Sequence, residues 1–277
     1  WPMRSELSNR MLASGTNALA SSIVLACRPR PDNAPMATRR EFIAALKNGL
    51  PKALVNLQHG NIAPVDLAQA AIGPGMAVFT RYSTVREADG SPMIVRTALA
   101  LINQTLDEVL AEQEGEFDAD TRWAVAWFEQ FGMEEGAFGD AETLSKAKNT
   151  SVQGLVQAGI LHSRGGKVRL LRRDELPEGW EPASDRRFTI WEATQYLIKA
   201  LEERGEQGAA ELLRKLGGLG ESARDLSYRL YNICERKKWA REALAYNSLV
   251  IAWPELTKLA RAIPLKVEEQ QVMSEPK

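Results

Sequence analysis

The chain has 277 residues, of which 44% are hydrophobic, and 35 Lys and Arg residues against 36 Asp and Glu residues give a formal net charge of -1. This length supports one large domain or two ordinary ones, and the even charge excludes a global attraction to nucleic acid or anionic membranes, though not a local patch. Two cysteines, Cys27 and Cys234, and two histidines, His59 and His162, are too few and too isolated for a disulfide framework or a zinc site. No apolar run approaches the roughly 20 residues that span a bilayer, so we expect a cytoplasmic protein.

The first predicted element is a strand. The chain begins at Trp1 rather than at an initiator methionine, and we therefore interpret it as part of a longer protein. Residues 17–28 predict a buried strand, because the β-branched residues Ile23 and Val24 have apolar neighbours on both faces. No comparable strand follows within forty residues, so we expect its sheet to be built by residues outside this sequence. The alternative is pairing with a strand predicted at residues 76–82.

Helices and one small hairpin are expected next. Thr38 predicts the N-cap of a helix over residues 39–59, which Pro51 should kink or split. A short helix at residues 66–72 is predicted to stop at the Gly-Pro-Gly that follows it. Strands at residues 76–82 and 92–96 are expected to form a hairpin through Asp89 and Gly90. A further amphipathic helix is predicted over residues 98–113.

Charge is distributed in two blocks of opposite sign. Residues 107–142 contain twelve acidic residues and one basic residue, Arg122. Residues 145–173 contain seven basic residues and no acidic one. The near-zero net charge therefore conceals a strongly dipolar middle region.

The same region predicts a winged helix. Helices are expected at residues 120–131, 141–147 and 151–158, followed by a hairpin at residues 160–171 that turns at Gly165 and Gly166. In a winged helix the third helix enters a major groove and the hairpin contacts phosphates. The candidate phosphate contacts are Lys146, Lys148, Arg164, Lys167, Arg169 and Arg172. Two alternatives remain: the basic hairpin is ordinary solvated surface, or the unit binds a protein.

The rest of the chain is predicted to be helical. Thr189 caps a helix that Gly205 interrupts, and the run of glycines at residues 217–220 is a linker rather than a phosphate loop, because no strand precedes it. Two further helices meet at a cationic corner, residues 235–242. The polar tail after Pro264 is expected to be disordered.

The first thirty residues resemble a known family. They are similar to the end of the catalytic domain in large bacterial and archaeal adenine-specific DNA methyltransferases that carry an N-terminal domain of unknown function. Stretches 72–85, 114–132 and 233–250 are also similar to the C-terminal region of that family. In that family a strand ends in the motif WP-[IM]-x-[ST]-E, which corresponds here to Trp1, Pro2, Met3, Ser5 and Glu6. A loop that contains Arg and Gly follows, here with Arg10 and Gly15. An ALASSI strand and a basic exit come next, here residues 18–23 and 27–30.

This resemblance implies a function for the parent protein. It implies that the parent binds S-adenosylmethionine in a Rossmann-like sheet and methylates N6 of an adenine that is flipped out of DNA. It places the cofactor loop and the DPPY-type motif before Trp1, so it implies no catalytic, cofactor-binding or metal-binding residue in this chain. It also suggests a place in restriction-modification or phage defence.

The expected fold class is mainly α with small β-hairpins (α+β). The expected domains are a remnant of the methyltransferase catalytic domain at 1–36, a helical region with a β-hairpin at 37–117, a winged-helix-like unit at 118–175, helical hairpins at 188–264 and a disordered tail at 265–277. The expected function is an accessory region that assists DNA binding.

Two other functions are considered. One is a helical scaffold that docks a partner subunit of a restriction or phage-defence complex, which predicts that the acidic block folds against the basic block and neutralises it. The other is a self-sufficient enzyme, which predicts an enclosed polar pocket.

Overall fold

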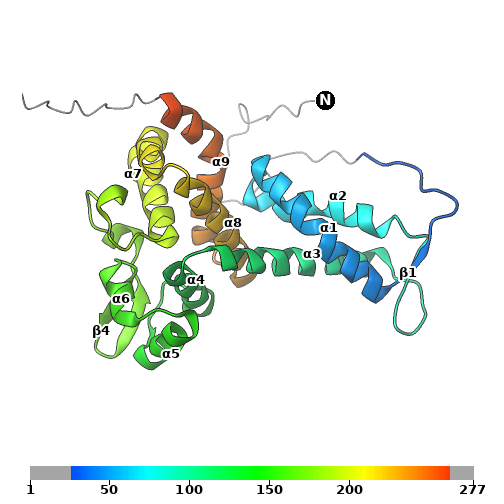
Figure 1. Cartoon of the computed structure of the whole chain (residues 1–277), viewed down its shortest axis with the longest axis horizontal. Coiled ribbons are helices and arrows are strands. Elements are labelled where there is room, and N and C mark those ends of the chain that lie inside the picture. Colours follow the sequence, from blue (N-terminus) through cyan, green and yellow to red (C-terminus); the bar gives the residue numbers. More distant parts are fainter. Residues whose placement is uncertain (1–25, 263–277) are drawn as a thin grey trace, which may run out of the picture.

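Residues 26–262 are described in the computed structural model, and most of them are helical (Figure 1). The expected fold class, mostly helical with small sheets, is confirmed. The helices are α1 (Arg39–His59), α2 (Pro64–Phe79), α3 (Val95–Glu112), α4 (Ala119–Phe131), α5 (Phe138–Lys148), α6 (Val152–Gln157), α7 (Ile190–Leu216), α8 (Leu219–Lys237) and α9 (Ala240–Ala262). The strands are β1 (Met36–Thr38), β2 (Thr84–Arg86), β3 (Gly136–Ala137), β4 (Leu161–Arg164) and β5 (Lys167–Leu170).

Helix α1 begins where the sequence predicts. The Glu41 backbone N–H donates to Thr38 Oγ1 at 3.3 Å and the Thr38 backbone N–H donates to the Glu41 carboxylate at 2.7 Å, which forms a capping box. Pro51 lies inside α1 and does not split it. The helix packs against α2 and α3. Its buried stripe consists of Phe42, Leu46, Leu50 and Leu54.

The strand predicted at residues 76–82 is wrong. Helix α2 continues through Pro74 to Phe79, so the predicted helix end at residue 72 is also wrong. The apolar run belongs to a helical stripe that α1 and α3 cover, and a Cβ on Gly75 would lie only 2.5 Å from the Ile102 side chain of α3. A mostly apolar run fits a strand or a buried helix equally well, and tertiary packing selects the helix here.

The strand predicted at residues 92–96 is also wrong, because Val95 already lies in α3. The predicted turn at Asp89 and Gly90 does form. The strand before it, β2, pairs in parallel with β1 instead of forming a hairpin. A single bridge between Arg86 and Pro92 is what remains of the predicted pairing in the described residues. The strand predicted at residues 17–28 lies almost entirely outside the described residues. The alternative prediction paired this strand with residues 76–82. That pairing is wrong, because residues 76–79 belong to helix α2.

The elements predicted between residues 118 and 175 are confirmed, and one strand is added. Asp118 caps α4, Ser151 caps α6, and Gly159 follows α6 with a φ of 70°. Gly165 and Gly166 turn the hairpin with φ values of 60° and 74°. The added strand, β3, lies between α4 and α5 and pairs antiparallel with β5, so the sheet order is β3-β5-β4.

The last three helices form the C-terminal part of the described chain. Gly205 interrupts α7 with φ 66° and ψ -166°, as predicted. The link from α7 to α8 is shorter than the predicted run of residues 217–220, because it consists of Gly217 and Gly218 while Gly220 is buried inside α8. The α8–α9 corner turns at Lys238, which has a φ of 59°. The tail after Pro264 lies outside the described residues.

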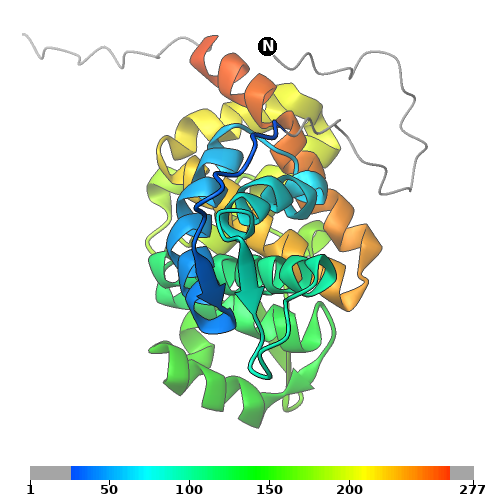
Figure 2. The same ribbon diagram turned by 90° about the vertical axis from the view of Figure 1, so that its right-hand side faces the viewer.

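One hydrophobic core joins the α4–β5 region to α7, α8 and α9. Its largest fully buried side chains include Trp123, Trp127, Phe128, Trp191 and Tyr246. Figure 1 shows α1, α2 and α3 extending away from this body, and Figure 2 shows the three side by side. Within residues 26–262, no helix has the length and apolar character needed to cross a membrane.

Candidate nucleic-acid interface

The six predicted phosphate contacts lie on two neighbouring elements and the segment after them. Lys146 and Lys148 occupy the last turn of α5, where positive charge suits the helix dipole. In the β4–β5 hairpin, Arg164 is paired with Lys167 and His162 with Arg169. These four side chains share one face, because the alternate residues of β5, Val168 and Leu170, are buried. The sixth cation, Arg172, is exposed just beyond β5.

Arg169 forms an ion pair with a carboxylate of its own chain. Its guanidinium donates to both oxygens of Glu175 at 2.6 Å, and only 17% of its side chain is exposed. Glu175 also accepts the backbone N–H of Arg172 at 2.9 Å. The hydrogen bonds from Arg169, with that of Arg172, lower the pKa of Glu175 to about 2. Arg169 therefore fixes the exit of the hairpin and is poorly placed to contact phosphate.

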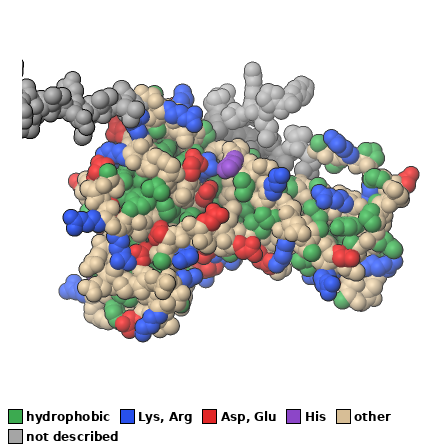
Figure 3. All heavy atoms as spheres, in the orientation of Figure 1, with side chains coloured by type: hydrophobic (Ala, Val, Ile, Leu, Met, Phe, Trp, Pro, Cys, Tyr) green, Lys and Arg blue, Asp and Glu red, His purple; other side chains and the backbone are tan. Residues whose placement is uncertain are grey.

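The other five cations are more available. Lys167 pairs with Glu135 at 3.1 Å, but both side chains are at least half exposed, so solvent weakens this pair. Lys146, Lys148, Arg164 and Arg172 have no ion pair within residues 26–262. Figure 3 shows Lys and Arg side chains on the lobe that contains α5, α6 and β4.

The acidic block does not neutralise this surface. Arg229 of α8 pairs with Glu114 and, at 3.3 Å, with Glu129, which also pairs with Arg236 at 2.7 Å. Asp107 accepts a hydrogen bond from Asn232 at 2.7 Å, again in α8. The pair of Lys167 with Glu135 is the only ion pair between residues 107–142 and residues 145–173 that the described chain contains. Three residues of the acidic block, Asp107, Glu114 and Glu129, thus attach α3, the segment after it and α4 to α8.

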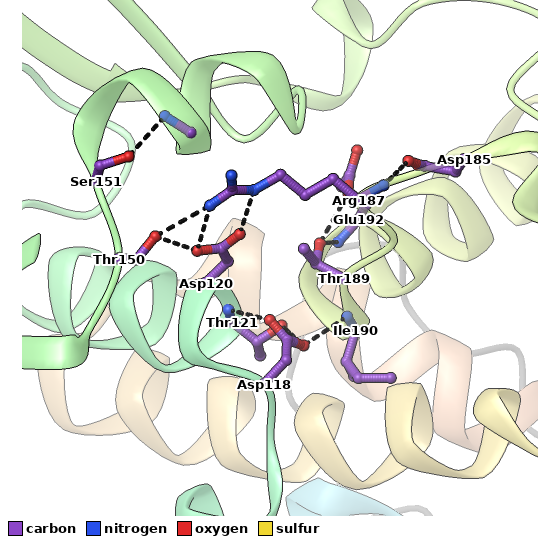
Figure 4. Close-up of polar contacts among 11 residues, drawn as sticks. Asp118, Asp120, Thr121, Thr150, Ser151, Asp185, Arg187, Thr189, Ile190 and Glu192 are labelled. Carbon is purple, nitrogen blue, oxygen red and sulfur yellow. Dashed lines mark hydrogen bonds and ion pairs between the residues drawn. The ribbon is translucent and has the colours of Figure 1, made fainter.

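A polar network fixes the start of α7 against α4 (Figure 4). Asp118 accepts the Thr121 backbone N–H at 2.8 Å and the Thr121 hydroxyl at 2.6 Å, and it also accepts the Ile190 backbone N–H at 3.1 Å. The Thr121 hydroxyl in turn accepts the Trp191 backbone N–H at 2.9 Å. One carboxylate therefore caps α4 and satisfies a free N–H at the start of α7.

A second part of the network holds the segment that enters α6. Arg187 donates to Asp120 from Nε at 2.8 Å and from Nη2 at 3.2 Å, and the Thr150 hydroxyl donates to the same carboxylate. A Cβ on Gly154 of α6 would lie 2.4 Å from Arg187 Nη2, so the guanidinium rests against the α6 backbone. The orientation of α6 is therefore coupled to the segment that precedes α7.

Glu192 lies beside this network as a buried acid. It is 4% exposed and accepts the Thr189 hydroxyl at 2.9 Å. Burial raises its pKa to about 8 and outweighs the hydrogen bond from Thr189, which lowers the pKa; the charges of Asp185, Asp118 and Asp120 raise it further by smaller amounts. Glu192 is therefore largely protonated at neutral pH.

Most of this network has no signal in the sequence. The spacing of Asp118 and Thr121 is a recognisable helix-cap signal, but nothing local indicates that Asp120 meets Arg187, 67 residues later. Within residues 26–262, no group of three or more His, Cys, Asp and Glu side chains is arranged to hold a metal ion.

Comparison with known proteins gave one finding. A family model described as a domain of unknown function (DUF8807) matches residues 118–273, more than half of the chain. No match was found among curated proteins or solved structures. The matched region starts at the N-cap of α4 and includes both the α4–β5 unit and α7–α9, which share one hydrophobic core.

Proposed function

We propose that this chain, which belongs to the DUF8807 family, is a DNA-contacting accessory region of an S-adenosylmethionine-dependent DNA adenine-N6 methyltransferase, and that its α4–β5 unit acts as a winged helix. The methyltransferase part of this proposal depends on the resemblance of the first thirty residues, which lie mostly outside the described structure. The DNA-contacting part depends on the geometry of residues 118–175. A role in restriction-modification or phage defence is part of the same proposal.

The observation that carries the DNA contact is the topology of the α4–β5 unit together with its cations. The order helix, strand, helix, helix, strand, strand with the sheet order β3-β5-β4 matches the order expected of a winged helix and supports this part of the proposal. Lys146 and Lys148 lie at the end of the second helix, just before α6, and Arg164 lies at the tip of the hairpin. These are the positions from which a docked winged helix reaches phosphates on either side of the groove.

The third helix, α6, supplies groups that suit base edges rather than phosphates. Its exposed side chains are Gln153, Val156 and Gln157. A glutamine amide can donate to and accept from a base edge, and an apolar side chain can contact a thymine methyl group. Because α6 carries no cation, the electrostatic part of binding depends on the residues that flank it.

Binding to a 30-base-pair duplex, measured by fluorescence anisotropy at several salt concentrations, tests this proposal. Replacing Lys146, Lys148 and Arg164 together by Gln should weaken binding and reduce the slope of log K against log salt by up to about 2.7, or about 0.9 for each phosphate that is no longer neutralised. A control variant replaces Lys52, Arg204 and Arg261 by Gln and should leave the salt slope unchanged. These three cations are exposed, lie elsewhere on the molecule and have no ion pair among the described residues. Undetectable binding at low salt, or equal slopes for the two variants, would refute the DNA contact.

S-adenosylmethionine is assigned to the parent protein and not to residues of this chain. In the full-length protein, the triple replacement at Lys146, Lys148 and Arg164 should raise the KM for DNA and leave the Kd for S-adenosylmethionine unchanged. Absence of adenine methylation by the full-length protein would contradict the methyltransferase assignment while leaving the DNA contact open to the binding assay.

Docking of a partner subunit is the second candidate function. Two apolar side chains on the α4–β5 unit favour it, because Phe138 is 38% exposed and Val156 is 41% exposed. Replacing both by Ser should release a protein partner that co-purifies with the full-length protein, whereas the winged-helix proposal predicts reduced DNA binding for Val156→Ser alone.

A further inference from the structure

A second cationic surface lies at the far end of α1, α2 and α3, away from the α4–β5 unit (Figure 1). We call it the arginine tip and define it as residues 26–43 and 80–97, which surround the sheet of β1 and β2. These two segments contain no lysine. The arginines of the tip are Arg28, Arg30, Arg39, Arg40, Arg81, Arg86 and Arg96.

The β1–β2 pairing brings the two halves of the tip together. Thr38 of β1 is the register partner of Arg86 in β2, and Arg39 pairs with Glu87 at 3.0 Å. The segment before β1 is held to the end of α2, because Arg30 donates to the Tyr82 carbonyl at 2.8 Å. Arginines that are up to 68 positions apart in the sequence therefore lie at the same end of the molecule.

The carboxylates of the tip do not balance its charge. There are four, and three of them are occupied by local contacts: Glu87 pairs with Arg39, Glu41 caps α1, and Asp89 accepts from Ser91. The fourth is Asp32, which is exposed. Arg30 and Arg86 donate only to neutral backbone carbonyls among the described residues. Arg40, Arg81 and Arg96 are exposed and form no ion pair within the described residues.

The tip also exposes an apolar face. Strand alternation buries Ala37 and Val85 and leaves Met36 outward with 64% of its surface exposed. Ile94 and Val95, at the start of α3, are 63% and 53% exposed. Three exposed apolar side chains thus lie among arginines at one end of the molecule.

We propose that the arginine tip is a second DNA-contacting surface, in which Arg40, Arg81 and Arg96 bind backbone phosphates while Met36 and Ile94 contact sugars and base edges. The guanidinium fork binds phosphate oxygens with two parallel hydrogen bonds, which favours arginine over lysine at such a site. Proteins that bind the minor groove combine arginines with Met or Ile side chains in this way. This inference deepens the proposed function and shares its premise that the partner is DNA.

Charge complementarity points to a polyanionic partner, and the shape of the apolar surface favours DNA over an anionic membrane. A membrane-surface element is normally an amphipathic helix with a long apolar face, whereas the apolar side chains here lie on a three-residue strand and a helix start. A linear polyanion is also the partner that two separate cationic surfaces on one chain can both use. Sedimentation with anionic vesicles distinguishes a membrane from DNA in the test below.

The test compares two triple variants of the full chain on the 30-base-pair duplex. Replacing Arg40, Arg81 and Arg96 by Gln removes three exposed cations without breaking an ion pair of the described chain, so folding should be unaffected, which circular dichroism checks. The variant should bind at least about tenfold more weakly near 0.1 M salt and show a salt slope reduced by up to about 2.7. The control is the Lys52, Arg204 and Arg261 triple variant, which should bind as the unmodified chain does.

Each remaining outcome is decisive. If the Lys146, Lys148 and Arg164 variant loses affinity and the tip variant does not, the second surface is refuted and the proposed function stands. If only the tip variant loses affinity, the tip is a DNA surface and the winged-helix contact fails. If the tip variant binds DNA normally but no longer sediments with phosphatidylserine vesicles that the unmodified chain binds, the tip is a membrane surface and the inference is overturned.

Discussion

At the scale of single residues, Glu192 is notable because its surroundings raise the pKa of its carboxyl group into the range near neutral pH. Its carboxyl group is buried next to the network that links α4, α6 and α7, and its pKa is raised to about 8. The folded protein therefore keeps a proton on Glu192 over a pH range in which the unfolded chain, with an ordinary pKa near 4.5, has lost it. Folding stability should consequently fall as pH rises from about 4.5 to about 8.

Glu192→Gln should remove this pH dependence. Glutamine resembles the protonated acid and can still accept the Thr189 hydroxyl, so the variant should be as stable as the unmodified protein near pH 4.5. At pH 8 it should be more stable than the unmodified protein by up to about 5 kcal/mol. This figure is the difference between the pKa of Glu192 in the folded protein and in the unfolded chain, converted to free energy. Urea unfolding at several pH values between 4.5 and 8 measures the difference. Parallel stability curves for the two proteins would show that Glu192 is not buried as a neutral acid.

At the scale of elements, close helix packing decides the structure of the α1–α3 unit. Gly75 lets α2 approach α3 because a side chain there would overlap Ile102. This contact accounts for the continuation of α2 through a Gly-Pro-Gly sequence that would ordinarily end a helix, since the packing energy outweighs the cost of Pro74.

Gly75→Ala should therefore destabilise the protein, although alanine is the better helix former. A Cβ at 2.5 Å from Ile102 forces the two helices apart, and overpacking of this kind costs about 1 to 3 kcal/mol. Gly139→Ala in α5 is the matched control, because nothing lies within 4 Å of its Cβ position. It should be neutral or stabilising by up to about 1 kcal/mol. Equal effects of the two substitutions on the denaturation midpoint would exclude close packing as the reason for Gly75.

At the scale of the whole molecule, the junction between the α1–α3 unit and the α7–α9 body combines a hydrophobic cluster, which includes Tyr228 and Val250, with polar contacts, of which Arg229 supplies a charged one. The Arg229 side chain is 5% exposed and pairs with Glu114 and Glu129, while Asn232 bonds Asp107 one turn further along α8. Part of the acidic block is therefore used for long-range attachment to α8.

Arg229→Met should loosen this junction. The substitution keeps the apolar stem but leaves Glu114 without its cation, whereas Glu129 keeps its pair with Arg236. Breaking a buried pair costs about 3 to 5 kcal/mol. The partial exposure of Glu129 reduces the expected loss to about 2 kcal/mol. Lys258→Met, in an exposed pair with Glu255, should cost less than about 0.5 kcal/mol. Chemical denaturation compares the two, and equal losses would show that the Arg229 ion pairs do not contribute to this junction.

The amino-acid sequence alone determined the features that depend on local chemistry. The N-cap at Thr38, the hairpin turn at Gly165 and Gly166, the left-handed residue at Gly159 and the break at Gly205 were all predicted correctly. A cap or a glycine turn depends on backbone sterics and on hydrogen bonds within a few residues, so its signal is contained in a short window. The positions of the six candidate cations followed from the same local elements.

The tertiary structure decided everything that joins distant segments. It made residues 76–79 helical, paired β1 with β2 across 48 positions and directed the acidic block towards α8 rather than towards the basic hairpin. It also separated Arg169, which is bound to Glu175, from the cations that remain available for phosphate. These outcomes depend on which surfaces exclude water together and which charges then meet, and no local window of the sequence contains that information.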